Sequence, residues 1–174
     1  MTTAADHLRA LTHEIPDFPE PGVVFRDLTP VFADGAALAA VADALAAPFA
    51  ASYDVVAGVE ARGFALAAAT AARSGHGILL IRKAGKLPRE RITENYALEY
   101  GTASLEVHVD QLPHAARVLL VDDVLATGGT LAAAQRLIDR AGWQLAGTSV
   151  ALELAALGGR AALASRDVHA VLTL

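Results

Sequence analysis

The feature that most constrains the fold is the stretch Val118–Thr130, which reads VLLVDDVLATGGT. It opens with four uncharged, β-compatible residues, a pattern typical of a strand buried on both faces of a parallel sheet. Two carboxylates, Asp122 and Asp123, follow, and a turn-rich segment then leads into apolar residues at helical spacing. The stretch therefore predicts a strand, an acidic pair, a glycine-rich loop and a helix in succession.

The loop after the acidic pair has the features of a phosphate-binding site. The first turn of a helix leaves backbone N–H groups unpaired and carries partial positive charge. Gly128 and Gly129 let the backbone approach an anion closely, and Thr127 and Thr130 add hydroxyl donors. No lysine follows the glycines, which excludes a Walker A loop. For an isolated Gly-Gly turn we would favour a plain surface loop, but the combination with the strand, the acids and the helix favours a ligand site.

This unit resembles the phosphoribosyl-diphosphate binding motif of the type I phosphoribosyltransferases. The resemblance implies that Asp122 and Asp123 contact the ribose hydroxyls. It also implies that the 5′-phosphate is held by the loop residues Ala126, Thr127, Gly128, Gly129 and Thr130. The motif defines a superfamily and leaves the substrate open.

Composition limits the other possibilities. The 174 residues suit a single domain, 1–174, and are enough to bury a sizeable core. The absence of cysteine excludes disulfides and thiol catalysis and fits a cytoplasmic protein. The net charge of −5 disfavours a nucleic-acid surface. We expect neither a signal peptide nor a membrane span, because the apolar stretches are too short.

The N-terminal segment from residue 15 to 30 cannot be a regular helix, because it holds four prolines and a glycine. Its apolar residues predict an ordered, irregular segment that forms the wall of a pocket or packs on the core or a second subunit. The segment is similar to the start of the adenine phosphoribosyltransferases. This likeness implies that residues 1–35 form a small hood, in which Val24, Phe25 and Arg26 line the adenine pocket.

Two further loops are predicted at the carboxyl ends of strands, the sheet edge where open α/β proteins bind ligands. One carries Arg62 at the start of a helix, where it would add positive charge to an anion site. The alternative is that Arg62 only caps a loop or pairs with Glu60. The other contains five cations from Arg82 to Arg91. An ordinary solvated loop can also be this basic, which is the alternative. The family resemblance extends to both loops, and it implies diphosphate binding by Arg62, Lys83 and Lys86.

Residues 85–103 are polar and turn-like, and they predict a mobile lid that excludes water during transfer, or an exposed hairpin with no such role. Glu99 lies in this segment, within a match to the adenine phosphoribosyltransferases that implies catalysis at the base. An ion pair with Arg89 or Arg91 is the alternative, and the residues alone rate the two about even. The alternation after residue 104 predicts a half-exposed strand with His108 on the surface.

Taken together, the sequence predicts an α/β fold with a central, mostly parallel sheet flanked by helices. The resemblance implies conversion of adenine and 5-phosphoribosyl 1-diphosphate to AMP and diphosphate in purine salvage. It further implies a homodimer and Mg²⁺ held mainly by substrate oxygens and water, without a protein metal cage. A transferase for another base, such as a 6-oxopurine or orotate, and a ligand-sensing regulator without turnover are the alternatives.

Overall fold

The computed structural model describes residues 2–97, 102–164 and 167–174, and its core is a seven-stranded sheet in the order β5-β6-β4-β3-β7-β8-β9. Five strands run parallel, and the β5–β6 hairpin adds two antiparallel strands at one edge. The strands are β3 (Val55–Val59), β4 (Gly77–Lys83), β5 (Arg91–Ala97), β6 (Thr102–His108), β7 (Arg117–Leu125), β8 (Gln144–Glu153) and β9 (Val168–Thr173). The expected α/β fold with a mostly parallel sheet is confirmed.

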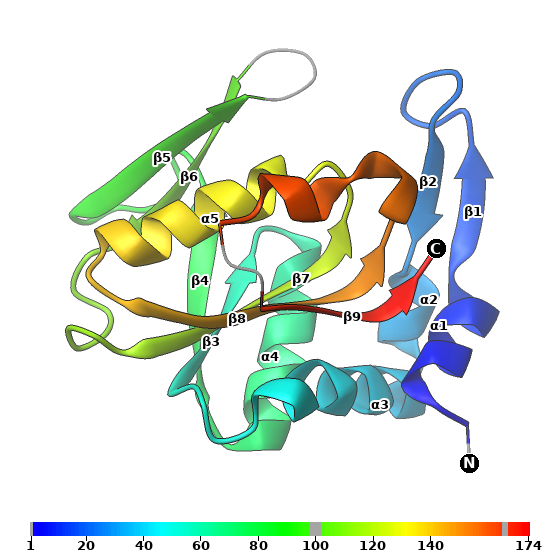
Figure 1. Ribbon diagram of the computed structural model, residues 1–174, viewed down its shortest axis with the longest axis horizontal. Helices are drawn as coiled ribbons and strands as arrows, with labels where there is room; N and C mark the ends of the chain where they lie inside the picture. Colours follow the sequence, from blue (N-terminus) through cyan, green and yellow to red (C-terminus); the bar gives the residue numbers. More distant parts are fainter. Residues whose placement is uncertain (1, 98–101, 165–166) are drawn as a thin grey trace.

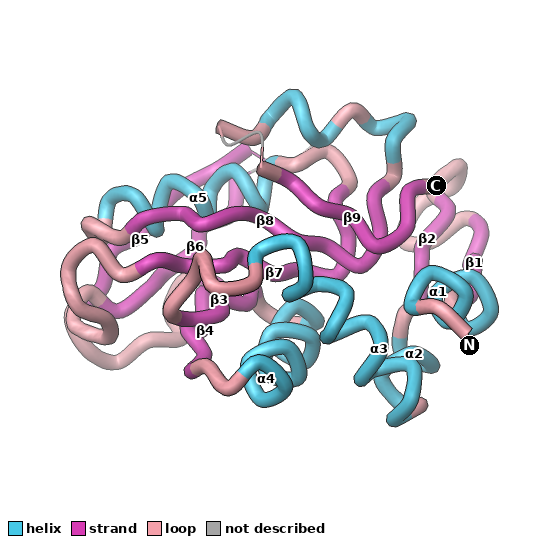
Figure 2. Tube along the Cα trace, turned by 60° about the horizontal axis from the view of Figure 1, so that its bottom comes forward, coloured by secondary structure: helices cyan, strands magenta, loops and turns pink. Residues whose placement is uncertain are grey.

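Helices cover both faces of this sheet (Figures 1 and 2). On one face lie α3 (Gly35–Ala46) and α4 (Arg62–Ser74), and on the other lies α5 (Gly129–Arg140). Each face has its own hydrophobic core, and β3 and β7 contribute side chains to both. This explains why β3 is buried along its whole length and why the two strands read as unbroken apolar runs.

Close packing of α4 on β3 depends on small residues. A side chain at Gly58 would place its Cβ 2.6 Å from the Cβ of Ala67 and 2.8 Å from the carbonyl oxygen of Gly63. The helix start is therefore held directly beside the ends of the central strands. Three loops meet at this carboxyl edge of the sheet, after β3, β4 and β7.

The N-terminal segment is more regular than expected. Strands β1 (His13–Pro16) and β2 (Val24–Asp27) form an antiparallel hairpin beside α1 (Ala4–Leu11) and α2 (Thr29–Ala33). Three prolines and a glycine lie at the end of β1 and in the connecting turn, and the fourth proline lies in α2, so β2 is free to donate its backbone hydrogen bonds. In Figure 1 this hood and the β5–β6 hairpin rise at opposite ends of the sheet.

Strand β6 is buried more deeply than its alternating sequence predicted. The side chains of Leu105 and Val107 reach the core under α5, whereas Glu106 and His108 lie on the other face and are also buried. The prediction that His108 is a surface residue is wrong. The loop before β5 folds against this strand, and the carbonyl oxygen of Glu90 lies 3.2 Å from Nδ1 of His108.

Over residues 154–164, the segment after β8 does not form an α-helix. It instead makes two short 3₁₀ turns, η2 (Ala155–Leu157) and η3 (Gly159–Ala162), and a third, η1 (Ala47–Phe49), follows α3. Glycine 158 separates the first two with a φ of +64°. In the described part of the chain, every helix is too short or too polar to cross a membrane.

Candidate active site

The acidic pair lies inside β7, not after it, and both carboxylates are buried. Asp122 is 8% and Asp123 6% exposed, and the backbone N–H of Asp123 donates a 2.9 Å hydrogen bond to Oδ1 of Asp122. Burial, and then the neighbouring Asp123 carboxylate, raise the pKa of Asp122 well above its usual range. A Cβ at Gly63 would lie 2.6 Å from Oδ1 of Asp122, so the acid fits only against a glycine.

The loop that follows β7 leads directly into α5, as predicted, with Gly128 at the N-cap in a left-handed conformation at φ +85°. A Cβ on Gly128 would lie 2.4 Å from the carbonyl oxygen of Gly159. A Cβ on Gly159 would in turn lie 2.1 Å from the carbonyl oxygen of Ala126. The loop therefore takes its shape against the 3₁₀ segment. We missed this partner in the sequence, where only the adjacent glycines 158 and 159 pointed to it.

Arg62 opens α4 and lies between the acidic pair and the hood. Its Nε is 2.8 Å from Oδ2 of Asp123, and its guanidinium carbon lies 4.9 Å from the ring centroid of Phe25. Its Nη1 also makes a long, 3.4 Å hydrogen bond to the carbonyl oxygen of Arg26. The sequence suggested Glu60 as its alternative partner, but in the structure Arg62 pairs with Asp123.

The proposed adenine wall lies on β2. Val24 is 42% exposed, and Phe25 packs edge-on against Phe18 with ring centroids 5.2 Å apart. The Arg26 side chain crosses the hairpin to the carboxylate of Glu14 and is mostly shielded from solvent. The structure thus brings the hood wall and the acidic pair to opposite sides of one guanidinium group.

The two lysines lie farther along the sheet edge, at and beyond the end of β4. Both Lys83 and Lys86 are exposed, and the backbone N–H of Lys83 donates a 2.9 Å hydrogen bond to Glu60. Arg82 also pairs with Glu60 at 3.3 Å. The Lys83 hydrogen bond, with Arg82 and Lys86, lowers the pKa of Glu60. This acid therefore joins the loop after β3 to the basic loop.

Buried Glu106 organises the basic loop, a role that the sequence did not reveal because alternation placed this acid on the surface. Its carboxylate accepts hydrogen bonds from the backbone N–H of Gly85 at 3.0 Å, from Arg91 at 3.1 Å and from Thr93 at 3.4 Å. Among the described residues, Arg91 thus already has an acidic partner, as does Arg89, which pairs with Asp110 at 2.8 Å.

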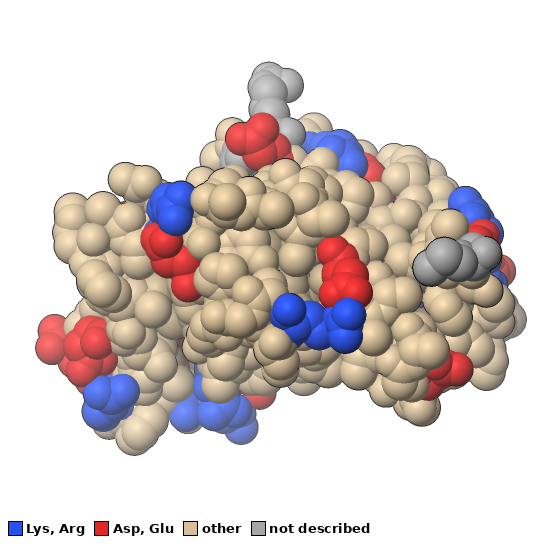
Figure 3. Space-filling view, turned by 90° about the horizontal axis from the view of Figure 1, so that it is seen from below, with Lys and Arg blue, Asp and Glu red and all other residues tan. Residues whose placement is uncertain are grey.

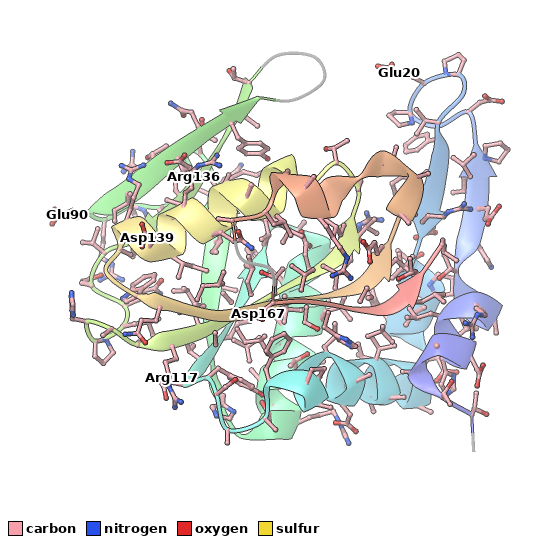
Figure 4. The ribbon with its side chains drawn as sticks, in the orientation of Figure 1. Glu20, Glu90, Arg117, Arg136, Asp139 and Asp167 are labelled. Carbon is pink, nitrogen blue, oxygen red and sulfur yellow. The ribbon has the colours of Figure 1, made fainter. Side chains whose placement is uncertain are left out.

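The β5–β6 hairpin is attached to α5 along its stem. Glu94 accepts from Nε of Arg136 at 2.5 Å and from Nη1 of Arg140 at 2.6 Å. Figure 4 shows Arg136 directed from α5 toward the hairpin. At the other end of the helix, the hydroxyl of Thr130 donates to the Tyr96 hydroxyl over 3.4 Å. The helix that begins at the candidate phosphate loop therefore also supports the hairpin stem.

Glu99 lies outside the described residues, so its predicted role stays a prediction. In the described part of the chain, His, Asp and Glu side chains do not gather in groups of three that could hold a metal ion. The carboxylates of Asp122 and Asp123 lie on β7 shortly before the candidate phosphate loop. Such a pair can accept hydrogen bonds from sugar hydroxyls or contribute to a Mg²⁺ ion held mainly by phosphate oxygens.

This site matches a known family. A model of the phosphoribosyl transferase domain matches residues 29–167, so the chain belongs to the phosphoribosyl transferase domain family. Within that family it falls among the adenine phosphoribosyltransferases, as two sets of relatives show.

Proteins named adenine phosphoribosyltransferase from Clavibacter sepedonicus and Renibacterium salmoninarum are 62% and 60% identical to it. The alignments cover 99% and 97% of this chain and 90% and 93% of theirs. The crystal structure of the Rhodothermus marinus enzyme has a TM-score of 0.91 at 42% identity and covers 98% of each chain. The Giardia lamblia enzyme in complex with 9-deazaadenine has a TM-score of 0.93 at 37% identity, over 100% of this chain and 99% of that one.

Proposed function

We propose that this chain transfers the 5-phosphoribosyl group from 5-phosphoribosyl 1-diphosphate to adenine, giving AMP and diphosphate in purine salvage. A nitrogen of the purine imidazole ring forms a bond to C1 of the ribose while the bond from C1 to the diphosphate oxygen breaks. Diphosphate leaves with the electron pair, and the base loses a proton. The observation that carries the proposal is the meeting of the acidic pair, the glycine-rich helix start and the hood wall at one sheet edge.

Each part of the site has a task in this reaction. The transition state resembles an oxocarbenium ion, so the protein must hold the sugar in line with the base and stabilise the leaving group. We assign the ribose hydroxyls to Asp122 and Asp123. The 5′-phosphate is assigned to Ala126, Thr127, Gly128, Gly129 and Thr130, because the start of α5 offers unpaired N–H groups there.

Adenine lies, in this proposal, against Val24, Phe25 and Arg26, and diphosphate binds Arg62, Lys83 and Lys86. The exposed lysines at the end of β4 and the cation at the start of α4 support the second assignment. Glu99 exchanges a proton or a hydrogen bond with the purine ring. The bound 9-deazaadenine in the Giardia relative supports a purine as the base.

Mg²⁺ is the cofactor that we propose, bound with the diphosphate. When bound, it neutralises charge on the leaving group. The site fits such an ion because its buried carboxylates offer hard oxygen ligands, and Asp122 and Asp123 are the residues that would complete the coordination by substrate and water.

The experiment that tests the function is a panel of bases offered with 5-phosphoribosyl 1-diphosphate and Mg²⁺. We expect product from adenine and none from hypoxanthine, guanine or orotate. Product from a 6-oxopurine or orotate would assign the chain to another base, and binding without any product would favour the regulator.

A homodimer in the cytoplasm completes the proposal. The face formed by α3 and α4, seen in Figure 3, carries few charged side chains and offers a surface on which a second copy can pack. Many alanines in α3 give this surface small side chains, with the Arg73–Asp43 ion pair across it, which suits a close approach. The cysteine-free sequence suits a reducing compartment.

A further inference from the structure

Arg62 occupies the junction between two parts of the site that are assigned to different ligands. Its guanidinium contacts the carboxylate of Asp123 on β7 and the ring of Phe25 on β2. A cation at the start of a helix is disfavoured by the helix dipole, so these contacts, not the helix, hold Arg62 in place. The side chain therefore links the acidic pair to the hood wall.

The apolar side chains near the tip of the hood are exposed to solvent. Phe18 is 51% and Val24 42% exposed, so the adenine wall is poorly buried without a ligand. The Arg62 group supports the wall in two ways, since its guanidinium carbon lies over the Phe25 ring and its Nη1 donates a hydrogen bond to the carbonyl oxygen of Arg26. Any ligand that fixes the guanidinium also fixes the surface that the base must meet.

We propose that Arg62 is a positioning residue that makes adenine and diphosphate bind cooperatively. The proposal rests on the function given above, in which diphosphate contacts Arg62 and adenine contacts Phe25. A guanidinium has five donors in a rigid plane, so it can bind a further anion while it remains in contact with the aromatic ring. Diphosphate then orders the wall before adenine arrives, and the second ligand binds to a site that is already ordered.

Lysine cannot replace arginine in this role, because its ammonium group has neither the plane nor the fork. A residue that only bound diphosphate would behave differently. Its replacement would weaken diphosphate binding but would leave the effect of bound diphosphate on adenine binding unchanged.

The test is calorimetric titration of adenine into the full chain with and without saturating inorganic diphosphate, at constant Mg²⁺. For the wild type we expect diphosphate to tighten adenine binding by about 5- to 150-fold, the usual range of coupling between sites. Arg62→Lys should bring this factor close to one. Phe25→Leu keeps an apolar wall but removes the aromatic face, and it should reduce the factor while diphosphate alone binds normally.

Lys86→Ala is the matched control, because Lys86 is an exposed cation of the basic loop. It should weaken diphosphate alone but keep the wild-type factor once diphosphate is saturating. A factor of one in the wild type, with both ligands bound, overturns the coupling and leaves the proposed function standing. The coupling is also overturned if diphosphate tightens adenine binding in Arg62→Lys or Phe25→Leu by the same factor as in the wild type. Failure of adenine to bind the wild type at all would instead reject the proposed function, and the coupling with it.

Discussion

Asp122 is an acid in a place that disfavours a charged acid, and this has a measurable effect on stability. Its raised pKa in the folded chain means that, above about pH 4, the folded state holds a proton that the unfolded chain has released. Stability therefore falls as the pH rises from the unfolded pKa toward the raised folded one. The fall ends above the folded pKa, where both states are ionised.

Asp122→Asn should remove this fall in stability, because an amide does not titrate in this pH range. The amide oxygen can still accept the hydrogen bond from the N–H of Asp123. We expect the variant to gain stability over the wild type as the pH rises above about 4, because only the wild type loses stability when the unfolded chain releases the Asp122 proton. It should at the same time bind AMP more weakly. Urea unfolding from pH 4 to 8 measures the gain, and a constant difference between the two proteins would contradict it.

Gly128 is a second residue whose identity is fixed by its surroundings. In Gly128→Ala, the new side chain meets both the left-handed backbone and the carbonyl oxygen of Gly159, so the loop must move away from the position proposed for the 5′-phosphate. The control is Gly75→Ala at the end of α4, which has a similar φ of +75° but nothing within 4 Å of the new Cβ. Left-handed backbone costs about 1–2 kcal/mol in either variant. Only Gly128→Ala should also lose AMP affinity, as titration calorimetry would show, and equal affinities would refute the close-approach argument.

Glu99 carries the prediction about chemistry. General acid–base groups contribute about 10²- to 10⁴-fold in rate, so Glu99→Leu should lower kcat by this amount while 5-phosphoribosyl 1-diphosphate still binds. Glu99→Gln keeps a hydrogen-bonding group and should be milder if positioning matters most. Steady-state kinetics with adenine decides the matter, and a near-normal kcat for Glu99→Leu would leave only a structural role.

At the scale of elements, α5 begins at the candidate phosphate loop and contacts the stem of the β5–β6 hairpin along its length. The hydrogen bonds from Arg136 and Arg140 lower the pKa of Glu94, so the contact persists down to acidic pH. Both arginines are about half exposed, which limits the pair to roughly 1 kcal/mol or less. The expected effect of breaking it is therefore local loosening, not unfolding.

Glu94→Gln should speed hydrogen exchange of the amides in β5 and β6 and lower the melting temperature only slightly. Asp110→Asn is the matched control, because it breaks an ion pair with Arg89 that is exposed on both sides. Mass spectrometry of peptides from the two strands measures the effect. Equal exchange in the two variants would mean that Glu94 does not hold the stem, and that packing of Ile92 and Tyr96 and the other hydrogen bonds of the hairpin suffice.

The sequence predicted elements well wherever one residue pattern determines one environment. The apolar run of β7 and the start of α5 are local signals and were found where expected, whereas β7 extends through the acidic pair that was predicted to follow it. Contacts between distant segments were not predictable. The pairing of Arg62 with Asp123, the burial of Glu106 and the support of Gly128 by Gly159 each depend on how separate loops are brought together by the sheet.

At the scale of the whole molecule, the prediction concerns assembly. We expect light scattering at micromolar concentration to give twice the 17.9 kDa mass of the chain. An alanine-rich, weakly charged face lets two copies approach closely, and burying it removes apolar surface from water (Figure 3). A stable mass of one chain would count against the homodimer.

The contact between Gly128 and Gly159 has a consequence for changes in chain length. Loops on the surface of a protein usually accept insertions, because their backbone contacts little else. The connection between β8 and β9 is an exception, since part of it forms the wall against which the phosphate loop is shaped. Lengthening this connection near Gly159 should therefore alter the proposed active site, whereas the turn at Gly75, before the amino end of β4, has open space around it and should accept an insertion.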